Sequence, residues 1–306
     1  MRKQAVVGAA VLALGVGTVG WVAASDGGQG GGSAVGIEAK GGVGAGLPQA
    51  SGDRLVAVGL TGDQRLVRFR VDRPGVVLPL GKVSGLKGDG RLVGIDYRVQ
   101  NNKLYGVGDE GGVYTIRELG AKATKVSQLS VAPQGRSFGV DFNPAANRLR
   151  VISDTGQNLR HNLDDPAGAP AAGTTAVDGT LTNPPVPPAT TGATASGVTG
   201  AAYTNNDLDA STATTLFDLD TVQDQTSIQS PANAGNLAPT GKAGVDVALD
   251  SGFDIYSSAN SGTNSGYAVT GSRVLRVDLL TGKATVTGGF PKGRQVLDLA
   301  IPLRQG

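Results

Sequence analysis

Residues 92–116 read LVGIDYRVQNNKLYGVGDEGGVYTI. Three runs rich in Val, Ile, Leu and Tyr are separated here by turns of Asn, Asp and Gly, which is typical of consecutive strands joined by tight turns. A fourth short run, TKVS at 124–127, follows after another turn. Helical periodicity is hard to find from Arg54 onward, so the sequence predicts an all-β domain built from four-stranded units.

The opening strand of this unit recurs along the chain. GIDY at 94–97 is followed by GVDF at 139–142, a looser GAAY at 200–203, GVDV at 244–247 and a degenerate VLDL at 296–299. The first four copies begin 45, 61 and 44 residues apart. Four strands in a unit of about 45 residues is the pattern of a β-propeller blade.

Five opening strands, beginning near residues 92, 137, 197, 243 and 295, predict a propeller of five four-stranded blades. The chain enters the domain at 55–58, which has the pattern of a second strand, followed by a third at 66–71 and a fourth at 76–80. The first blade therefore lacks its opening strand, and we expect residues 295–301 to supply it. Such closure by the two ends of the chain removes an exposed sheet edge.

The long interval before the fourth blade contains an insert. Residues 166–196 are rich in Pro, Ala, Thr and Gly, a composition that disfavours regular strand pairing. We expect part of this stretch to be an excursion between the third and fourth blades. A degenerate sixth blade hidden in it is the alternative.

The first 24 residues have the pattern of a targeting segment. Arg2 and Lys3 precede an uncharged, mostly apolar run at 5–24, and small residues at 22–24 fit cleavage before Ser25. Residues 25–53 form a glycine-rich linker to the propeller at 54–306. We expect a secreted protein. Because residues 5–24 are long enough to span a bilayer, the alternative is a membrane-anchored protein that faces outward.

The composition excludes several classes of protein. The sequence has no Cys and one His, which rules out disulfides, thiol catalysis and metal sites with several histidines. Removal of Arg2 and Lys3 leaves 25 of the 27 Lys and Arg to balance 25 Asp and Glu. A domain without net charge does not attract nucleic acid through electrostatics. We expect contact with a membrane only through an uncleaved N-terminal segment. We also expect a monomer.

Four long strings resemble a bacterial family called domain of unknown function 4394. They are LVGIDYRVQNNKLYGVGDEGGVYTI at 92–116, FGVDFNPAANRLRVISDTGQNLR at 138–160, VTGAAYTNND at 198–207 and TTLFDLDT at 214–221. The resemblance runs from about residue 55 to residue 301. It implies secreted or surface-associated propeller-like proteins without an assigned activity, so it supplies no catalytic residues.

The repeated acidic residue of the opening strands is the main candidate for chemistry. Asp96, Asp141, Asp246 and Asp298 take the same place in four of the five copies. Four carboxylates near one mouth of the channel could hold a cation such as Ca²⁺. The alternative, which the repetition favours, is that each accepts hydrogen bonds from turns of its own blade. We therefore predict no cofactor, with Ca²⁺ as the candidate if these residues bind an ion.

Other candidates have weaker patterns. The acidic stretch at 205–224 lacks the residue order and central glycine of an EF-hand loop. His161 could be a general base, but no nucleophile motif accompanies it, and a polar residue at a blade edge is the simpler interpretation. The sequence thus favours a non-enzymatic propeller that binds a protein or a cell-surface ligand. The alternative is a secreted metal-assisted hydrolase or lactonase that acts at the channel mouth.

Overall fold

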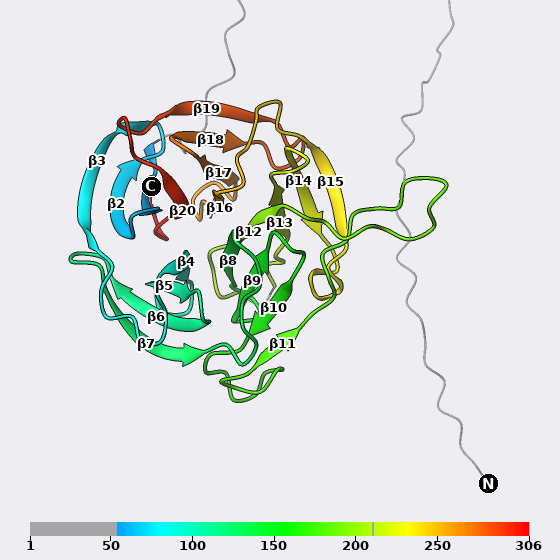
Figure 1. The fold of residues 1–306 in the computed structure, drawn as a ribbon, viewed down its shortest axis with the longest axis horizontal. Coiled ribbons are helices and arrows are strands. Elements are labelled where there is room, and N and C mark those ends of the chain that lie inside the picture. The colour runs from blue at the N-terminus through cyan, green and yellow to red at the C-terminus, as the bar shows by residue number, and fades with distance from the viewer. Residues whose placement is uncertain (1–53, 210, 306) are drawn as a thin grey trace, which may run out of the picture. The chain divides into compact units, whose positions relative to one another are not determined.

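The computed structural model describes residues 54–209 and 211–305, and five four-stranded sheets account for nearly all its regular structure. Viewed along its shortest axis, the domain is a ring of five blades whose inner strands surround the central axis, where the channel of a propeller lies (Figure 1). This confirms the prediction of an all-β, five-bladed propeller and contradicts the six-bladed alternative. The predicted targeting segment at 1–24 and linker at 25–53 lie outside the described residues.

Every blade runs from an inner strand beside the channel to an outer strand at the rim. Blade 1 consists of β20 (Val296–Ala300), β1 (Val56–Thr61), β2 (Arg65–Arg70) and β3 (Arg73–Lys82). Blade 2 consists of β4 (Leu92–Arg98), β5 (Lys103–Gly108), β6 (Gly112–Arg117) and β7 (Lys122–Gln128). Blade 3 consists of β8 (Phe138–Asn143), β9 (Arg148–Ser153), β10 (Asn158–His161) and β11 (Thr175–Val177).

The remaining blades follow the same order. Blade 4 consists of β12 (Val198–Tyr203), β13 (Leu216–Asp220), β14 (Gln225–Gln229) and β15 (Leu237–Lys242), with the short 3-10 helix η2 (Ala232–Ala234) before its last strand. Blade 5 consists of β16 (Ser251–Ser257), β17 (Asn264–Thr270), β18 (Arg273–Val277) and β19 (Ala284–Gly289).

The two ends of the domain meet in blade 1. Strand β20 pairs antiparallel with β1, so that Ala300 lies opposite Val58 and Asp298 lies opposite Leu60. The closing strand predicted at 295–301 is therefore confirmed. This pairing gives β1 a neighbour on both sides and joins residues far apart in the sequence.

The opening strand of blade 5 differs from the prediction. The structure places it at β16, whereas residues 244–247 belong to the connection from blade 4. Gly244 has a φ of 72°, a left-handed conformation that a strand cannot continue through. All residues of β16 except the last are buried, as a strand between two neighbouring blades requires. GFDIY at 252–256 therefore belongs to the opening strand of blade 5.

The insert at 166–196 belongs partly to blade 3. It contains β11, which pairs with β10 and forms the outer strand of that blade. From there the chain crosses to blade 4, where Thr182 forms a parallel bridge with Asn236. Leu181 and Ala195 are fully buried in this crossing. The Pro-rich part at 184–191 is exposed, so the composition correctly indicates a surface loop only there.

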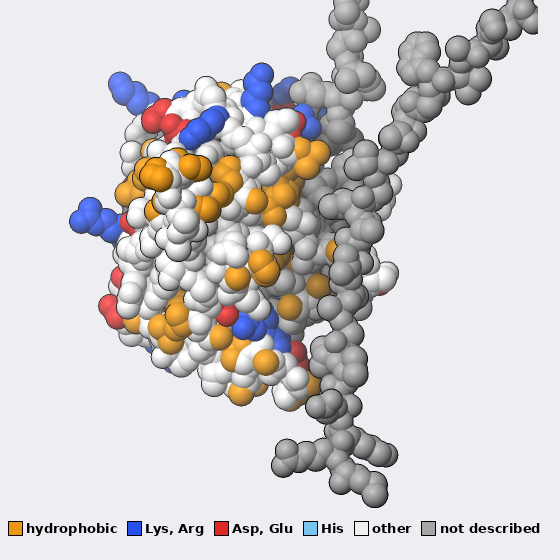
Figure 2. All heavy atoms as spheres, turned by 90° about the vertical axis from the view of Figure 1, so that its right-hand side faces the viewer, with side chains coloured by type: hydrophobic (Ala, Val, Ile, Leu, Met, Phe, Trp, Pro, Cys, Tyr) orange, Lys and Arg blue, Asp and Glu red, His pale blue; other side chains and the backbone are white. Residues whose placement is uncertain are grey.

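The apolar core is divided among the five seams, a term used here for the spaces between adjacent blades. Each seam contains its own cluster of buried apolar side chains. Aromatic pairs contribute to the core at two of the seams. The ring centroids of Phe69 and Phe290 are 4.8 Å apart, and those of Tyr105 and Phe142 are 5.1 Å apart. On the face shown in Figure 2, hydrophobic side chains lie in several small groups separated by polar surface. No described helix is long and apolar enough to cross a membrane.

Candidate functional site

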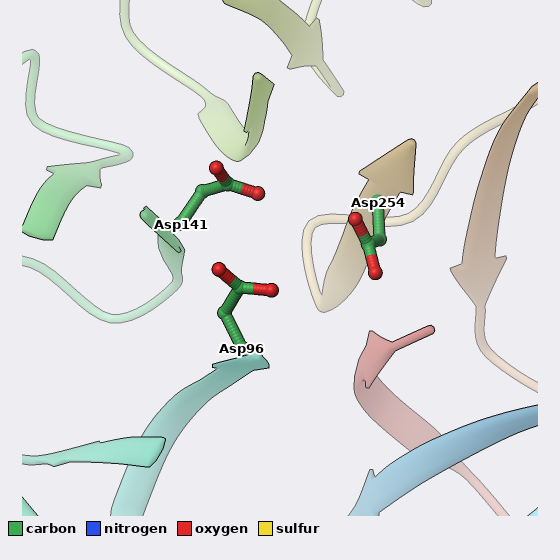
Figure 3. Close-up of side chains that lie close together, drawn as sticks. All are labelled: Asp96, Asp141 and Asp254. Atoms are coloured by element: carbon green, nitrogen blue, oxygen red, sulfur yellow. The ribbon is translucent and has the colours of Figure 1, made fainter. Parts of the chain in front are cut away.

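Three carboxylates converge at one mouth of the channel. Asp96 of β4, Asp141 of β8 and Asp254 of β16 point toward a common space (Figure 3). One carboxylate oxygen from each lies within 4.8 Å of those of the other two. The three residues, called the acidic cluster below, are only 4–7% exposed.

Strand register explains why these three residues share one level of the channel. In each blade the opening strand pairs with the second strand. The residues at the equivalent position of blades 2, 3, 4, 5 and 1 are Asp96, Asp141, Ala202, Asp254 and Ala300, which lie opposite Tyr105, Arg150, Phe217, Tyr267 and Val58. Blades 4 and 1 thus contribute alanines at this level. The sequence repeat placed Asp298 here, but the structure shifts the closing strand by two residues.

Asp298 lies one level deeper, among glycines. A Cβ added to Gly94 would be 3.1 Å from Asp298 Oδ2, and one added to Gly252 would be 2.3 Å from Asp298 Oδ1. The other blades contribute Gly139 and Gly200 to this level. A Cβ on Gly139 would approach the backbone nitrogen of Ala201 in the next blade to 2.6 Å. Glycine is required here because the inner strands come so close together.

Of the four predicted carboxylates, the structure therefore brings two, Asp96 and Asp141, into the acidic cluster. Asp246 is exposed in the connection before blade 5 and is not on an opening strand. Its place is taken by Asp254, which the repeat pattern missed. The signal for Asp254 was present in GFDI at 252–255, which keeps the bulky residue between Gly and Asp that GIDY also has.

The carboxylates join neighbouring blades. Asp96 Oδ2 accepts a hydrogen bond from the backbone N–H of Phe142 at 2.8 Å, and Asp141 Oδ1 accepts one from Tyr203 at 3.2 Å. Asp254 Oδ2 accepts one from Ile301 at 2.6 Å. The expectation that each carboxylate binds turns of its own blade is therefore wrong: these partners are on the next blade.

A fourth seam uses the deeper carboxylate. Asp298 Oδ2 accepts a hydrogen bond from the N–H of Ile95 at 2.7 Å, which joins blade 1 to blade 2. Among the described residues, the seam between blades 4 and 5 alone has no such bond, because Ala202 stands at the corresponding position. There the N–H of Ile255 binds Oδ1 of the adjacent Asp254 instead, at 2.6 Å.

Burial makes ionisation of the acidic cluster unfavourable. It raises the pKa of Asp96 and of Asp141 well above the usual value, and repulsion from neighbouring carboxylates raises both further. Burial also raises the pKa of Asp254 to about 6. The cluster therefore holds its protons to higher pH than exposed carboxylates do, and a bound cation would offset the same cost of ionisation.

The space among the carboxylates is small. A cavity of about 10 Å³ lies there, and its lining also includes Tyr203, Asn205 and Leu303. This is room for one water molecule or one ion. Because Ca²⁺ binds oxygens at about 2.3–2.6 Å, two ligands on opposite sides of one ion lie close to 5 Å apart, which the cluster satisfies. The three carboxylates could thus hold a cation of this size.

The other predicted candidates lie elsewhere. His161 is fully buried on β10, which pairs with strands on both sides, so the interpretation as a residue at a blade edge is wrong. Its Nε2 lies 2.8 Å from Ser127 Oγ and its Nδ1 lies 3.0 Å from Thr175 Oγ1. Burial lowers its pKa to about 4. Asp207 and Asp209 of the acidic stretch are exposed, whereas Asp218 and Asp220 are buried in β13. Within the described residues, this stretch supplies no group of three metal-ligating side chains.

The fold and this site define a class: a five-bladed β-propeller with a ring of carboxylates that joins its blades around a narrow channel mouth. The chain belongs to the family described as Domain of unknown function (DUF4394), whose family model matches residues 65–300. No curated protein matches the sequence.

Several solved structures resemble the chain distantly. A chain of a nidogen/laminin complex has 11% identity and a TM-score of 0.42, over 82% of this chain and 99% of that one. An auxiliary nutrient binding protein from Bacteroides thetaiotaomicron has 10% identity and a TM-score of 0.42, over 82% and 62% of the two chains. A protein of unknown function from the same organism has 14% identity and a TM-score of 0.41, over 82% and 67%. Likenesses at this level carry no information on function.

Proposed function

We propose that this protein is an exported, non-catalytic β-propeller that binds a ligand or partner, and that its acidic cluster is structural. The observation that supports this most is the use of the carboxylates: four of the five seams have a carboxylate–backbone hydrogen bond between blades. A side chain used in this way at nearly every seam serves the ring as a whole rather than one reaction.

The size of the channel mouth also favours a non-catalytic role. The cavity at the acidic cluster, about 10 Å³, is too small for an organic substrate. Gln305 keeps the C-terminal segment in place beside this mouth: its side chain accepts a hydrogen bond from the N–H of Val56 and donates one to the same residue's carbonyl. Larger hollows lie away from the acidic cluster, such as a groove of about 910 Å³ between blades 4 and 5.

Export is part of the proposal and is supported by the sequence of residues 1–53, with its targeting pattern and glycine-rich linker. Mass spectrometry of the native host's medium and membrane fractions tests it. We expect a chain that begins at Ser25. A chain that keeps residues 1–24 and occurs only in membranes would instead support the outward-facing anchored form.

A metal-assisted hydrolase or lactonase is the second candidate, because the spacing of the three carboxylates suits a cation. A cation would supply a water of lowered pKa as nucleophile. An organic substrate would need more room than this cavity of about 10 Å³ offers, for example through movement of the segment around Leu303, which lines it.

Hydrolysis assays separate the two candidates. The mature protein is incubated with a panel of esters and lactones, with added Ca²⁺, added Zn²⁺ or chelator. We expect no turnover above that of the Asp141→Asn variant. Metal-dependent hydrolysis that is lost in a folded Asp141→Asn protein would overturn the proposal and establish the hydrolase.

A further inference from the structure

Three arginines line a hollow at the seam between blades 3 and 4. Arg148 and Arg150 lie two residues apart on β9, and Arg160 of β10 lies directly opposite Arg150. Cross-strand partners lie on the same face of a sheet, and so do residues two apart on one strand, so the three arginines share one face. This face is turned toward blade 4. With Tyr203 and Asn233 of blade 4 they line a hollow of about 280 Å³, called the arginine pocket below.

The arginine pocket has more positive than negative charge. Asp178 binds both Arg150 and Arg160, at 2.7 and 3.0 Å, and Asp165 binds Arg148 at 3.1 Å. Two carboxylates thus serve three guanidinium groups. The side chains of Arg148 and Arg150 are only 6% and 2% exposed, so water solvates their charges poorly.

One further acid faces this seam without neutralising the pocket. Asp218 of β13 is fully buried, and neither of its carboxylate oxygens has a hydrogen-bond partner. Burial raises its pKa well above the usual value, although the charge of Arg150 acts in the opposite direction. Because neither oxygen of Asp218 bonds to a guanidinium group, Asp218 pairs with none of the three arginines.

The unused polar groups of the arginine pocket are donors. A guanidinium has five N–H groups, and Arg160 donates one from each of its three nitrogens, to Asp178 and to the carbonyl of Ala169. Two N–H groups of Arg160 therefore have no acceptor among the described residues. The Tyr203 hydroxyl accepts from Arg150 at 3.3 Å, which leaves its own proton to donate.

We propose that the arginine pocket binds a small oxyanion, a carboxylate or a phosphate group, through Arg160 and Tyr203, with Arg148 and Arg150 supplying buried positive charge. Such a ligand offers several acceptor oxygens and carries negative charge that complements the three guanidinium groups. Arginine pairs with both groups through two parallel N–H···O bonds. The inference rests on the proposed binding function and gives it a location and a ligand class.

Calorimetric titration of the mature protein with inorganic phosphate, and separately with acetate, tests the proposal at constant ionic strength in chloride. We expect saturable binding of at least one of the two, and the better ligand identifies the source of the oxyanion. Arg160→Gln should weaken binding at least about tenfold, the usual scale for losing a charge-assisted bond. Its side chain is 22% exposed, more than those of Arg148 and Arg150, which makes it the safest of the three to change.

Two further variants keep the test specific. Asp165→Asn removes a negative charge beside Arg148 but keeps the oxygen that accepts from the N–H of Ala167, so it should strengthen oxyanion binding several-fold. Arg65→Gln removes the same charge as Arg160→Gln, from a surface ion pair in blade 1, and should leave binding unchanged.

Two outcomes would overturn the proposal: no saturable binding of phosphate or acetate by the wild type, or binding that Arg160→Gln leaves unchanged. Loss of binding in Arg65→Gln would assign the anion to another place. The proposed function is tested separately, because the hydrolysis assay probes the acidic cluster through Asp141→Asn and does not involve Arg160. A titration without binding therefore does not change the conclusion from the hydrolysis assay. Likewise, hydrolysis of an ester or lactone would not change the conclusion from the titration.

Discussion

Oδ2 of Asp96 accepts a hydrogen bond from the backbone N–H of Phe142 at 2.8 Å, across the seam between blades 2 and 3. The two residues are 46 positions apart in the chain. Most strand pairs of the propeller join neighbours in sequence, so each blade is largely local. Contacts such as this one connect the local units into a ring, and Asp141, Asp254 and Asp298 repeat it at three other seams.

The first prediction separates the acceptor role of Asp96 from its charge. Asp96→Asn keeps an acceptor oxygen for Phe142 and removes a carboxylate that is costly to ionise, so its free energy of unfolding at neutral pH should equal or exceed that of the wild type. Asp96→Ala leaves the N–H of Phe142 without this partner. It should be about 1–3 kcal/mol less stable than the Asn variant in urea unfolding.

Asp246 provides the matched control, because the repeat pattern placed it with Asp96 but the structure leaves it exposed. Asp246→Ala and Asp246→Asn should differ by less than about 0.5 kcal/mol. Equal stabilities for Asp96→Ala and Asp96→Asn would contradict the role of the seam bond.

The second prediction concerns pH. Burial raises the pKa of Asp254 from 3.8 to about 6, so the folded protein binds a proton between these values that the unfolded chain has lost. The stabilisation is complete below pH 3.8 and declines as the pH rises through about 6, by about 3 kcal/mol in total. Asp254→Asn cannot ionise and should lack this decline.

His161 changes the free energy of unfolding with pH in the opposite direction. Burial lowers its pKa to about 4, so its contribution is present above the usual value of 6.5 and is lost as the pH falls toward 4. The measurement is therefore the difference in free energy of unfolding between Asp254→Asn and wild type at each pH, in which the His161 effect cancels. A difference that does not change between pH 4 and 6 would contradict the raised pKa.

The third prediction concerns ring closure. Truncation after Gly293 removes β20, which exposes the edge of β1 and deletes two seam bonds, from Asp254 to Ile301 and from Asp298 to Ile95. The truncated chain should aggregate or remain unfolded. Gln305→Ala is the control, because it removes side-chain bonds to Val56 but leaves β20 in place. Soluble truncated protein with unchanged melting would refute closure by β20.

The fourth prediction concerns the glycine level of the channel. A Cβ at Gly139 would lie 2.6 Å from the backbone nitrogen of Ala201, so Gly139→Ala must push two inner strands apart. We expect a loss of about 1–3 kcal/mol or more in the free energy of unfolding. Gly62→Ala, where the nearest atoms are side-chain carbons 3.9 Å away, should change stability by less than about 0.5 kcal/mol. Similar effects for both variants would contradict the close approach.

The blades could be predicted because their information is local. Strands alternate with turns inside each unit, and both Asp96 and Asp141 recur at a fixed offset from Gly. The unpaired second strand at the entry then required a closing strand from the C-terminal end. This reasoning needs only short-range pattern and the rule that sheet edges are covered.

The composition of the acidic cluster could not be predicted in full, because a residue's level in the channel depends on pairing between distant strands. GVDV at 244–247 matches the repeat in amino-acid sequence, but Gly244 has a left-handed backbone conformation that does not occur in a strand. The closing strand β20 is shifted by two residues, which places Asp298 one level deeper in the channel. This shift can be recognised only from the pairing of Asp298 with Leu60 of β1. The arginine pocket likewise depends on the register of β9 with β10, which sets Arg150 opposite Arg160.

The central claim is that the carboxylates at the channel mouth join the blades and do not hold a catalytic cation. It is tested most directly by thermal unfolding of the mature protein and its Asp141→Asn variant, each with chelator and with Ca²⁺. A cation that binds only the folded state must raise the melting temperature. We predict the same melting temperature for the wild type in chelator and in Ca²⁺. A rise with Ca²⁺ in the wild type that is absent in Asp141→Asn would contradict the claim.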